Sequence, residues 1–157
     1  MLGFSWIIPG LLAGASLPGS GGDPSSDLTE LARLGVYRLV SLTDQASGFA
    51  EACRKANLRW EYFPIDEFDV PSDPQAFARL VQRLLADLRA GRPVCAHCFA
   101  GVGRTGLLLA CLLGRFLGLG PEEAIRRVRA ARPALETPDQ ELFVRRFLER
   151  NKTTRLG

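Results

Sequence analysis

The stretch VCAHCFAGVGRTG, residues 94–106, decides the fold. Its apolar beginning, within RPVCAHC (92–98), predicts a short strand that is buried on both faces. A glycine-rich loop follows, and then a helix from about residue 104 to residue 117. This order places Cys98 at the carboxyl end of a buried strand, where open α/β sheets bind their ligands.

The rest of the chain alternates strand-like and helical segments, which predicts an α/β fold with a central, mostly parallel sheet flanked by helices on both faces. Ser26 or Asp27 is a candidate cap for the first helix. We expect strands at 36–42, 58–65 and 92–98, after two short N-terminal strands around a turn. We expect helices at 27–35, 48–56, 74–91, 104–117, 121–132 and 137–150. Helix 74–91 carries an apolar face made of Phe77, Leu80, Val81, Leu84, Leu85 and Leu88.

Composition restricts the class of protein. The 157 residues are 46% hydrophobic and 24% charged, which suits a single catalytic domain over residues 1–157. A net charge of +3 without a Lys/Arg block suits an anionic ligand and argues against nucleic acid as a partner. The apolar segment 1–19 has no preceding basic residue and is interrupted by Pro9 and Gly10, so we predict strands there, neither a leader peptide nor a membrane anchor.

The four cysteines do not form the pattern of a secreted disulfide framework. We therefore expect a reducing, cytoplasmic location and a monomer. Cys53 and Cys111 are expected in the core. Cys95, His97 and Cys98 are too few for a closed zinc site, so no metal or other cofactor is expected. The lone His97 is expected to be a hydrogen-bonded core residue that orients the loop.

The loop after Cys98 has the composition of an anion site. Glycines at 101 and 103 allow backbone amides to turn inward as a nest, and the helix that follows adds its positive N-terminal end. The same features favour the nucleophilic thiolate of Cys98. Arg104 can fork two N–H bonds onto a phosphate, and Thr105 can donate its hydroxyl to the sulfur. The predicted phosphate-binding residues are Phe99, Ala100, Gly101, Val102, Gly103 and Arg104.

The residues HCFAGVGRTG (97–106) resemble the H-C-x-x-G-x-x-R-[ST]-G signature of the cysteine-dependent protein tyrosine phosphatases. The short chain is similar to the compact, VHZ-type dual-specificity phosphatases, and FSWIIPGLLAG, VYRLVSLTD and RPALETPDQ fit the same family. The resemblance implies a metal-independent phosphomonoester hydrolase that forms a phosphocysteine intermediate. Its implied substrates are phosphorylated proteins, with phosphotyrosine preferred and phosphoserine or phosphothreonine accepted.

The resemblance also implies a general acid on the loop after the YFPI strand, three residues after its proline. Here that position is Glu67, with Asp66 before it, so the chain departs from the usual Asp. We favour Asp66, with Glu67 as the alternative and Asp69 third. Gln140, in the segment TPDQ (137–140), either places the hydrolytic water or makes a structural bond.

Three other functions remain open from the sequence. The first is a pseudophosphatase that binds phosphoproteins without turnover, and the irregular acid loop is the only feature that favours it. The second is a thiol redox protein, because CAHC has redox spacing. However, a strand directs Cys95 and Cys98 to opposite sides. The third is a phosphatase of a non-protein phosphomonoester. However, the loop has no lysine beside Arg104 that could bind the additional phosphates of a polyphosphorylated ligand.

Overall fold

A central sheet organises the molecule, which a computed structural model describes for residues 3–156, with side chains for 3–150. The strand order is β1-β2-β5-β3-β4; β1 runs antiparallel to β2, and the remaining neighbours are parallel. Met1, Leu2 and Gly157, at the ends of the predicted domain, lie outside the described residues. The strands are β1 (Ser5–Ile8), β2 (Leu12–Ala15), β3 (Arg38–Ser41), β4 (Arg59–Tyr62) and β5 (Val94–His97).

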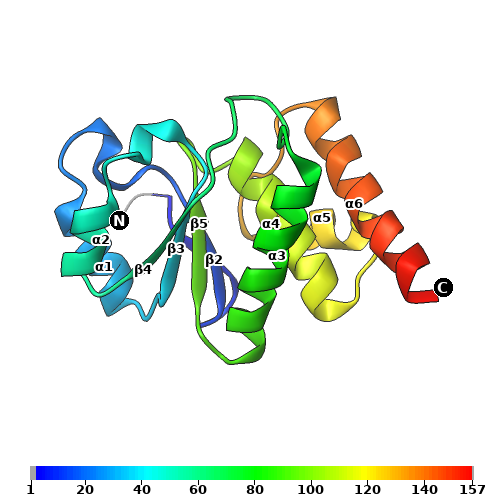
Figure 1. Cartoon of the computed structure of the whole chain (residues 1–157), viewed down its shortest axis with the longest axis horizontal. Coiled ribbons are helices and arrows are strands. Elements are labelled where there is room, and N and C mark those ends of the chain that lie inside the picture. The colour runs from blue at the N-terminus through cyan, green and yellow to red at the C-terminus, as the bar shows by residue number, and fades with distance from the viewer. Residues whose placement is uncertain (1–2, 157) are drawn as a thin grey trace.

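Helices cover both faces of this sheet, as Figure 1 shows, with α1 and α2 on one side and α3 to α6 on the other. The α-helices are α1 (Ser25–Arg33), α2 (Ala50–Lys55), α3 (Pro74–Arg89), α4 (Gly103–Leu117), α5 (Pro121–Ala131) and α6 (Pro138–Leu156). Two short 3-10 helices are η1 (Pro18–Gly21) and η2 (Asp44–Ala46). The predicted fold class is confirmed.

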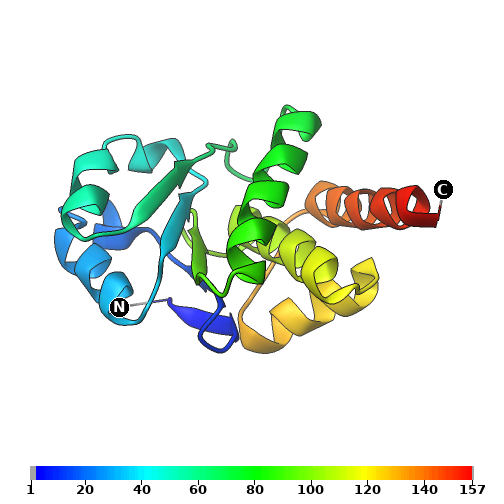
Figure 2. The ribbon, with the colours of Figure 1, turned by 60° about the horizontal axis from the view of Figure 1, so that its bottom comes forward.

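Each face of the sheet has its own hydrophobic core. The larger core contains the buried face of α3, most of α4 and parts of α5 and α6. The smaller core lies under α1 and α2 and includes Cys53 and Cys95. β5 is central and packs into both cores, so the loop after it begins from a fully buried strand. The far end of α6 extends away from the body of the molecule (Figure 2).

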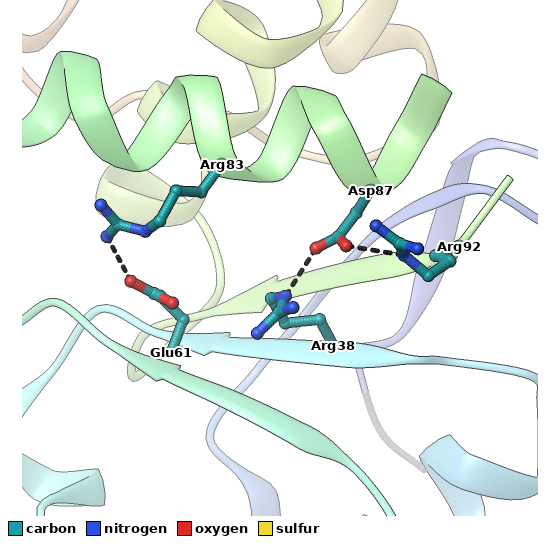
Figure 3. Close-up of polar contacts among 5 residues, drawn as sticks. All are labelled: Arg38, Glu61, Arg83, Asp87 and Arg92. Carbon is teal, nitrogen blue, oxygen red and sulfur yellow. Dashed lines mark hydrogen bonds and ion pairs between the residues drawn. The ribbon is translucent and has the colours of Figure 1, made fainter. Parts of the chain in front are cut away.

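Ionic contacts fasten α3 to the sheet in addition to its buried apolar face (Figure 3). The nearly buried carboxylate of Asp87 accepts hydrogen bonds from Nε of Arg38, at 2.5 Å, and from Nε of Arg92, at 2.9 Å. Arg83 on α3 pairs with Glu61 on β4. Asp73 caps the start of α3 by accepting from the amide of Ala76. These contacts set the direction in which α3 leaves the loop that precedes it.

The structure corrects two boundaries. Helix α1 begins at Ser25 with Pro24 in the capping position and no side-chain cap, so the expected cap by Ser26 or Asp27 is wrong. The carboxylate of Asp27 instead accepts a hydrogen bond from the amide of Gly19, at 2.8 Å, and holds the preceding loop. The last helix continues to Leu156, beyond the expected end at residue 150. Within the described residues, every helix is too short or too polar to cross a membrane.

Candidate active site

Cys98 follows the last residue of β5, as the sequence predicts, and its side chain is almost completely buried. The hydroxyl of Thr105, in the first turn of α4, donates to the Cys98 sulfur at 3.1 Å. The structure therefore brings the predicted nucleophile and the predicted hydroxyl donor together.

Three carbonyl groups of the loop at residues 99–103 are bonded to the surrounding protein. In contrast, no described residue accepts a hydrogen bond from the backbone amides of these residues. Loop amides that lack an acceptor, beside a helix N-terminus, form a site for an oxyanion. The carbonyl contacts are Leu17 N to Phe99 O at 2.8 Å, Leu135 N to Val102 O at 3.0 Å, and the Arg132 guanidinium to Gly101 O.

Arg132 is a buried residue of the site that the sequence analysis did not single out. Its Nε and Nη2 donate to Gly101 O, at 3.1 and 2.9 Å. Its Nη1 donates to Gly14 O at 2.5 Å, to Gly3 O at 2.7 Å and to the Ser5 hydroxyl at 2.8 Å. Burial lowers the pKa of this guanidinium. The nearby Cys95 and Cys98 raise the pKa and so offset part of this effect. Arg132 thus ties the loop to the N-terminal strands.

Gly101 is required by this arrangement. Its φ of +77° lies in the left-handed region, and a Cβ there would come within 2.4 Å of Arg132 Nη2 and 2.5 Å of Ala15 O. A side chain at this position would displace the carbonyl that Arg132 holds.

Arg104 is also buried and performs two tasks at once. Its Nη1 donates to Ile65 O at 2.8 Å and lies 3.5 Å from Leu42 O, which anchors the loop after β4. Its Nε and Nη2 have no acceptor among the residues described, so these donors are available to a phosphate. One nitrogen positions the guanidinium, and the others remain available to a ligand in the cavity that Arg104 lines.

A cavity of about 270 Å³ opens beside Arg104. It lies at the carboxyl ends of the parallel strands, between the Cys98 loop and the loop after β4. Its lining residues are Thr43, Asp44, Gln45, Pro64, Ile65, Asp66, Glu67, Phe99 and Arg104.

His97 is a hydrogen-bonded core residue, as expected. The Trp60 indole donates to the Ser41 hydroxyl at 2.9 Å. The Cys98 carbonyl can only accept, so His97 Nδ1, 2.9 Å away, carries the proton. Its Nε2 then accepts from the Ser41 hydroxyl at 2.6 Å. The neutral ring therefore fixes the backbone of Cys98 through a chain of bonds that begins at Trp60.

This buried ring makes stability depend on pH. Burial lowers the pKa of His97 to about 4, and Arg104 adds to the effect, while the ordinary value is 6.5. As the pH falls from 6.5 toward 4, His97 therefore becomes protonated in the unfolded chain but stays neutral in the folded chain. We expect His97 to lower the free energy of unfolding by about 2 kcal/mol between pH 7 and pH 5. Urea unfolding of the wild type and of His97→Asn would measure it, and parallel pH slopes would contradict it.

The other three cysteines have a different environment. Burial raises the pKa of Cys53 to about 11 and of Cys95 to about 12, and it also raises the pKa of Cys111. All four cysteines are free, and Cys95 and Cys98 pack into cores on opposite faces of the sheet. A working disulfide between Cys95 and Cys98 does not fit this geometry.

The comparisons with known proteins identify the family. Residues 1–155 match the family model described as a Swiss Army Knife protein, DSP-PTPase phosphatase domain. The chain belongs to the dual-specificity branch of the cysteine-dependent protein tyrosine phosphatases. Its fold is similar to Tk-PTP in the active form, with a TM-score of 0.82 and 27% identity over 96% of this chain and 99% of that one.

Two curated relatives of this phosphatase domain are longer proteins. The chain is 32% identical to mouse protein tyrosine phosphatase domain-containing protein 1, over 92% of this chain but 21% of the relative. It is 29% identical to putative tyrosine phosphatase 067L of invertebrate iridescent virus 3, over 81% of this chain and 60% of the relative. The chain therefore spans less than two thirds of either relative.

The acid loop of this phosphatase domain is the segment after β4 that carries Asp66, Glu67 and Asp69. Only two of its three carboxylate residues line the cavity. Asp66 and Glu67 both line the cavity beside Arg104. The carboxylate of Asp69 accepts from the amide of Val70 at 2.7 Å, and Asp69 is not among the residues that line the cavity. Phe68, between them, is exposed with a φ of +65°, which turns the chain sharply after Glu67. The loop thus presents the two favoured acid candidates to the site.

Gln140 is fully buried, and both ends of its amide are bonded to backbone. Its Oε1 accepts from the amide of Glu136 at 2.8 Å, and its Nε2 donates to Asp69 O at 3.1 Å. A Cβ on Gly103 would lie 3.0 Å from this amide, so Gln140 sits between α4 and the acid loop. Gln140 therefore makes the structural hydrogen bonds that were one of its two predicted roles.

Proposed function

We propose that this chain hydrolyses phosphomonoesters on proteins through a phosphocysteine intermediate on Cys98. Phosphotyrosine is the preferred substrate, and phosphoserine and phosphothreonine are accepted. One observation carries the proposal: the Cys98 sulfur accepts from the Thr105 hydroxyl in the first turn of α4, and the loop that joins them has amides without an acceptor among the described residues and leads to the uncommitted donors of Arg104. A nucleophile at the start of an oxyanion-binding loop is what phosphoryl transfer requires.

The first step forms the sulfur–phosphorus bond and breaks the bond from phosphorus to the ester oxygen. The Cys98 thiolate attacks, and the general acid gives its proton to the leaving oxygen. The loop amides and Arg104 hold the equatorial oxygens, which gain charge as the phosphoryl group becomes planar.

The second step reverses these roles. A water attacks phosphorus, the carboxylate accepts its proton, and the sulfur leaves as a thiolate. The Thr105 hydroxyl, which already donates to this sulfur at 3.1 Å, stabilises the departing charge. Neither step needs a metal, and we propose that the chain uses none.

We propose Asp66 as the general acid, because its side chain lines the cavity and Asp is the residue type that the family uses there. Asp66→Asn is expected to lower kcat on a phosphotyrosyl peptide about 100-fold, because the leaving oxygen loses its proton donor. Glu67→Gln is expected to lower kcat only a few-fold, because Asp66 is retained. Stopped assays of phosphate release would measure both.

Asp69→Asn is the matched control, since its carboxylate is bonded within its own turn. The peptide is the informative substrate, because nitrophenolate is a good leaving group and needs little help from an acid. A larger loss in Glu67→Gln than in Asp66→Asn would transfer the role to Glu67.

The experiment that tests the function is release of phosphate from p-nitrophenyl phosphate in EDTA. Iodoacetate should stop turnover by alkylating Cys98, and vanadate should protect it; burial with raised pKa keeps Cys53, Cys95 and Cys111 unreactive. A folded, reduced chain that binds phosphotyrosyl peptides but releases no phosphate would overturn the hydrolase and favour a pseudophosphatase. Turnover of small phosphomonoesters alone would favour a non-protein substrate.

We further propose that residues 1–157 act as one catalytic domain, as a cytoplasmic monomer without nucleic acid or membrane partners. Four free cysteines and a net charge of +3 without a basic block support these points. Gel filtration with light scattering would measure the oligomeric state.

A further inference from the structure

The entrance to the phosphate cavity has the opposite charge to the chain as a whole. Three exposed carboxylates line it, those of Asp44, Asp66 and Glu67, and Arg104 is the only cation among its lining residues. The complete chain has a net charge of +3. A cavity that takes a phosphate dianion is therefore lined by like charge.

Among the residues with described side chains, these carboxylates have no paired cation. None of the three forms an ion pair within the part of the chain that the structure describes. Carboxylates elsewhere on the surface, such as Glu30, Glu51 and Glu123, are paired with nearby arginines. The rim of the cavity is thus left with unsatisfied negative charge.

The backbone holds these side chains at the rim. Asp44 begins η2, where Thr43 accepts from the amide of Gln45 and Asp44 O accepts from the amide of Ser47, both within 3.3 Å. Asp66 begins a turn in which its carbonyl accepts from the amide of Asp69, at 3.0 Å. The two carboxylates reach the cavity from different loops, after β3 and after β4.

We propose that Asp44 and Glu67, the cavity carboxylates other than the proposed general acid, bind lysine or arginine side chains that flank the phosphorylated residue. The substrate class would then be basic phosphotyrosyl peptides, and ligands with several phosphates would be repelled. The proposal rests on the proposed function for its phosphate site. Phe99, which is 49% exposed, lines the same cavity and adds apolar surface there.

The expected effect is modest because the rim is exposed. We expect peptides with arginine on both sides of phosphotyrosine to bind about 5-fold more tightly than peptides with glutamate there. The preference should shrink as salt is added, because exposed charges are screened.

The experiment compares matched phosphotyrosyl peptides with arginine, alanine or glutamate flanks. Their binding to Cys98→Ser is measured by fluorescence anisotropy at low and high ionic strength, and kcat/KM is measured with the wild type. Affinity should fall in the order arginine, alanine, glutamate. Asp44→Asn should reduce the preference about 2-fold. Glu30→Gln, which removes the same charge from α1, should leave it unchanged.

Equal affinity for the three peptides, tighter binding of the glutamate peptide, or an unchanged preference in Asp44→Asn would each overturn the proposal. The outcomes separate it from the proposed function, since p-nitrophenyl phosphate has no flanking residues. If the wild type hydrolyses that ester normally but shows no flank preference, only the proposal about the rim carboxylates is contradicted. If the peptides show a flank preference in binding but the wild type releases no phosphate, only the proposed hydrolase activity is contradicted.

Discussion

Replacing Cys98 by serine is expected to lower kcat for p-nitrophenyl phosphate by at least about 10⁴-fold. The serine oxygen would occupy the same place beside Thr105, but its hydroxyl stays protonated at neutral pH and is a poor nucleophile. The loop amides and the free donors of Arg104 are unchanged by the substitution. The variant should therefore bind vanadate and phosphopeptides while releasing no phosphate.

The control for this experiment is Cys53→Ser. Cys53 is fully buried in the smaller core on the other face of the sheet. Serine there should lower the melting temperature, because it buries a hydroxyl, but should keep kcat within a few-fold. Steady-state kinetics and thermal unfolding of both variants measure this contrast. If Cys98→Ser kept a tenth of the activity, a phosphocysteine intermediate would be ruled out.

The sequence alone was sufficient for the parts of the site that are continuous in the chain. The strand, the loop and the first turn of α4 form one local unit, so Cys98, Arg104 and Thr105 are brought together by backbone geometry over a few residues. The buried face of α3 could also be predicted from the sequence, because its apolar residues follow the helical period. All of the predicted residues are buried.

The parts that depend on distant segments could not be predicted. Arg132 holds carbonyls more than a hundred positions earlier in the chain. Its sequence signals were its place before Pro133 at the end of a helix and its position at the start of the segment RPALETPDQ, and neither indicates which carbonyls it holds. The second bond of Gln140, to Asp69, spans 71 positions. No local pattern records such contacts, since they depend on how the helices pack against the sheet. The unpaired carboxylates at the cavity rim belong to the same class.

Arg104→Lys is expected to lower kcat/KM by about 10³-fold, although the positive charge is retained. In the structure Nη1 is committed to Ile65 O and Leu42 O, while Nε and Nη2 remain for the phosphate. A lysine ammonium is a compact group on one nitrogen. It cannot bind these carbonyls and at the same time donate to two phosphate oxygens, as the planar guanidinium can. It should also release the loop that carries Asp66, so part of the loss should come from slower protonation of the leaving group.

The split between kcat and KM tests this double role. Because the phosphate oxygens gain charge in the transition state, most of the loss should fall on kcat. The part due to the acid loop should be larger for a phosphotyrosyl peptide than for p-nitrophenyl phosphate, whose leaving group needs little protonation. Arg126→Lys, an exposed conservative change on α5, should alter neither constant. A loss confined to KM, equal for both substrates, would show that Arg104 contributes charge alone and does not position the loop.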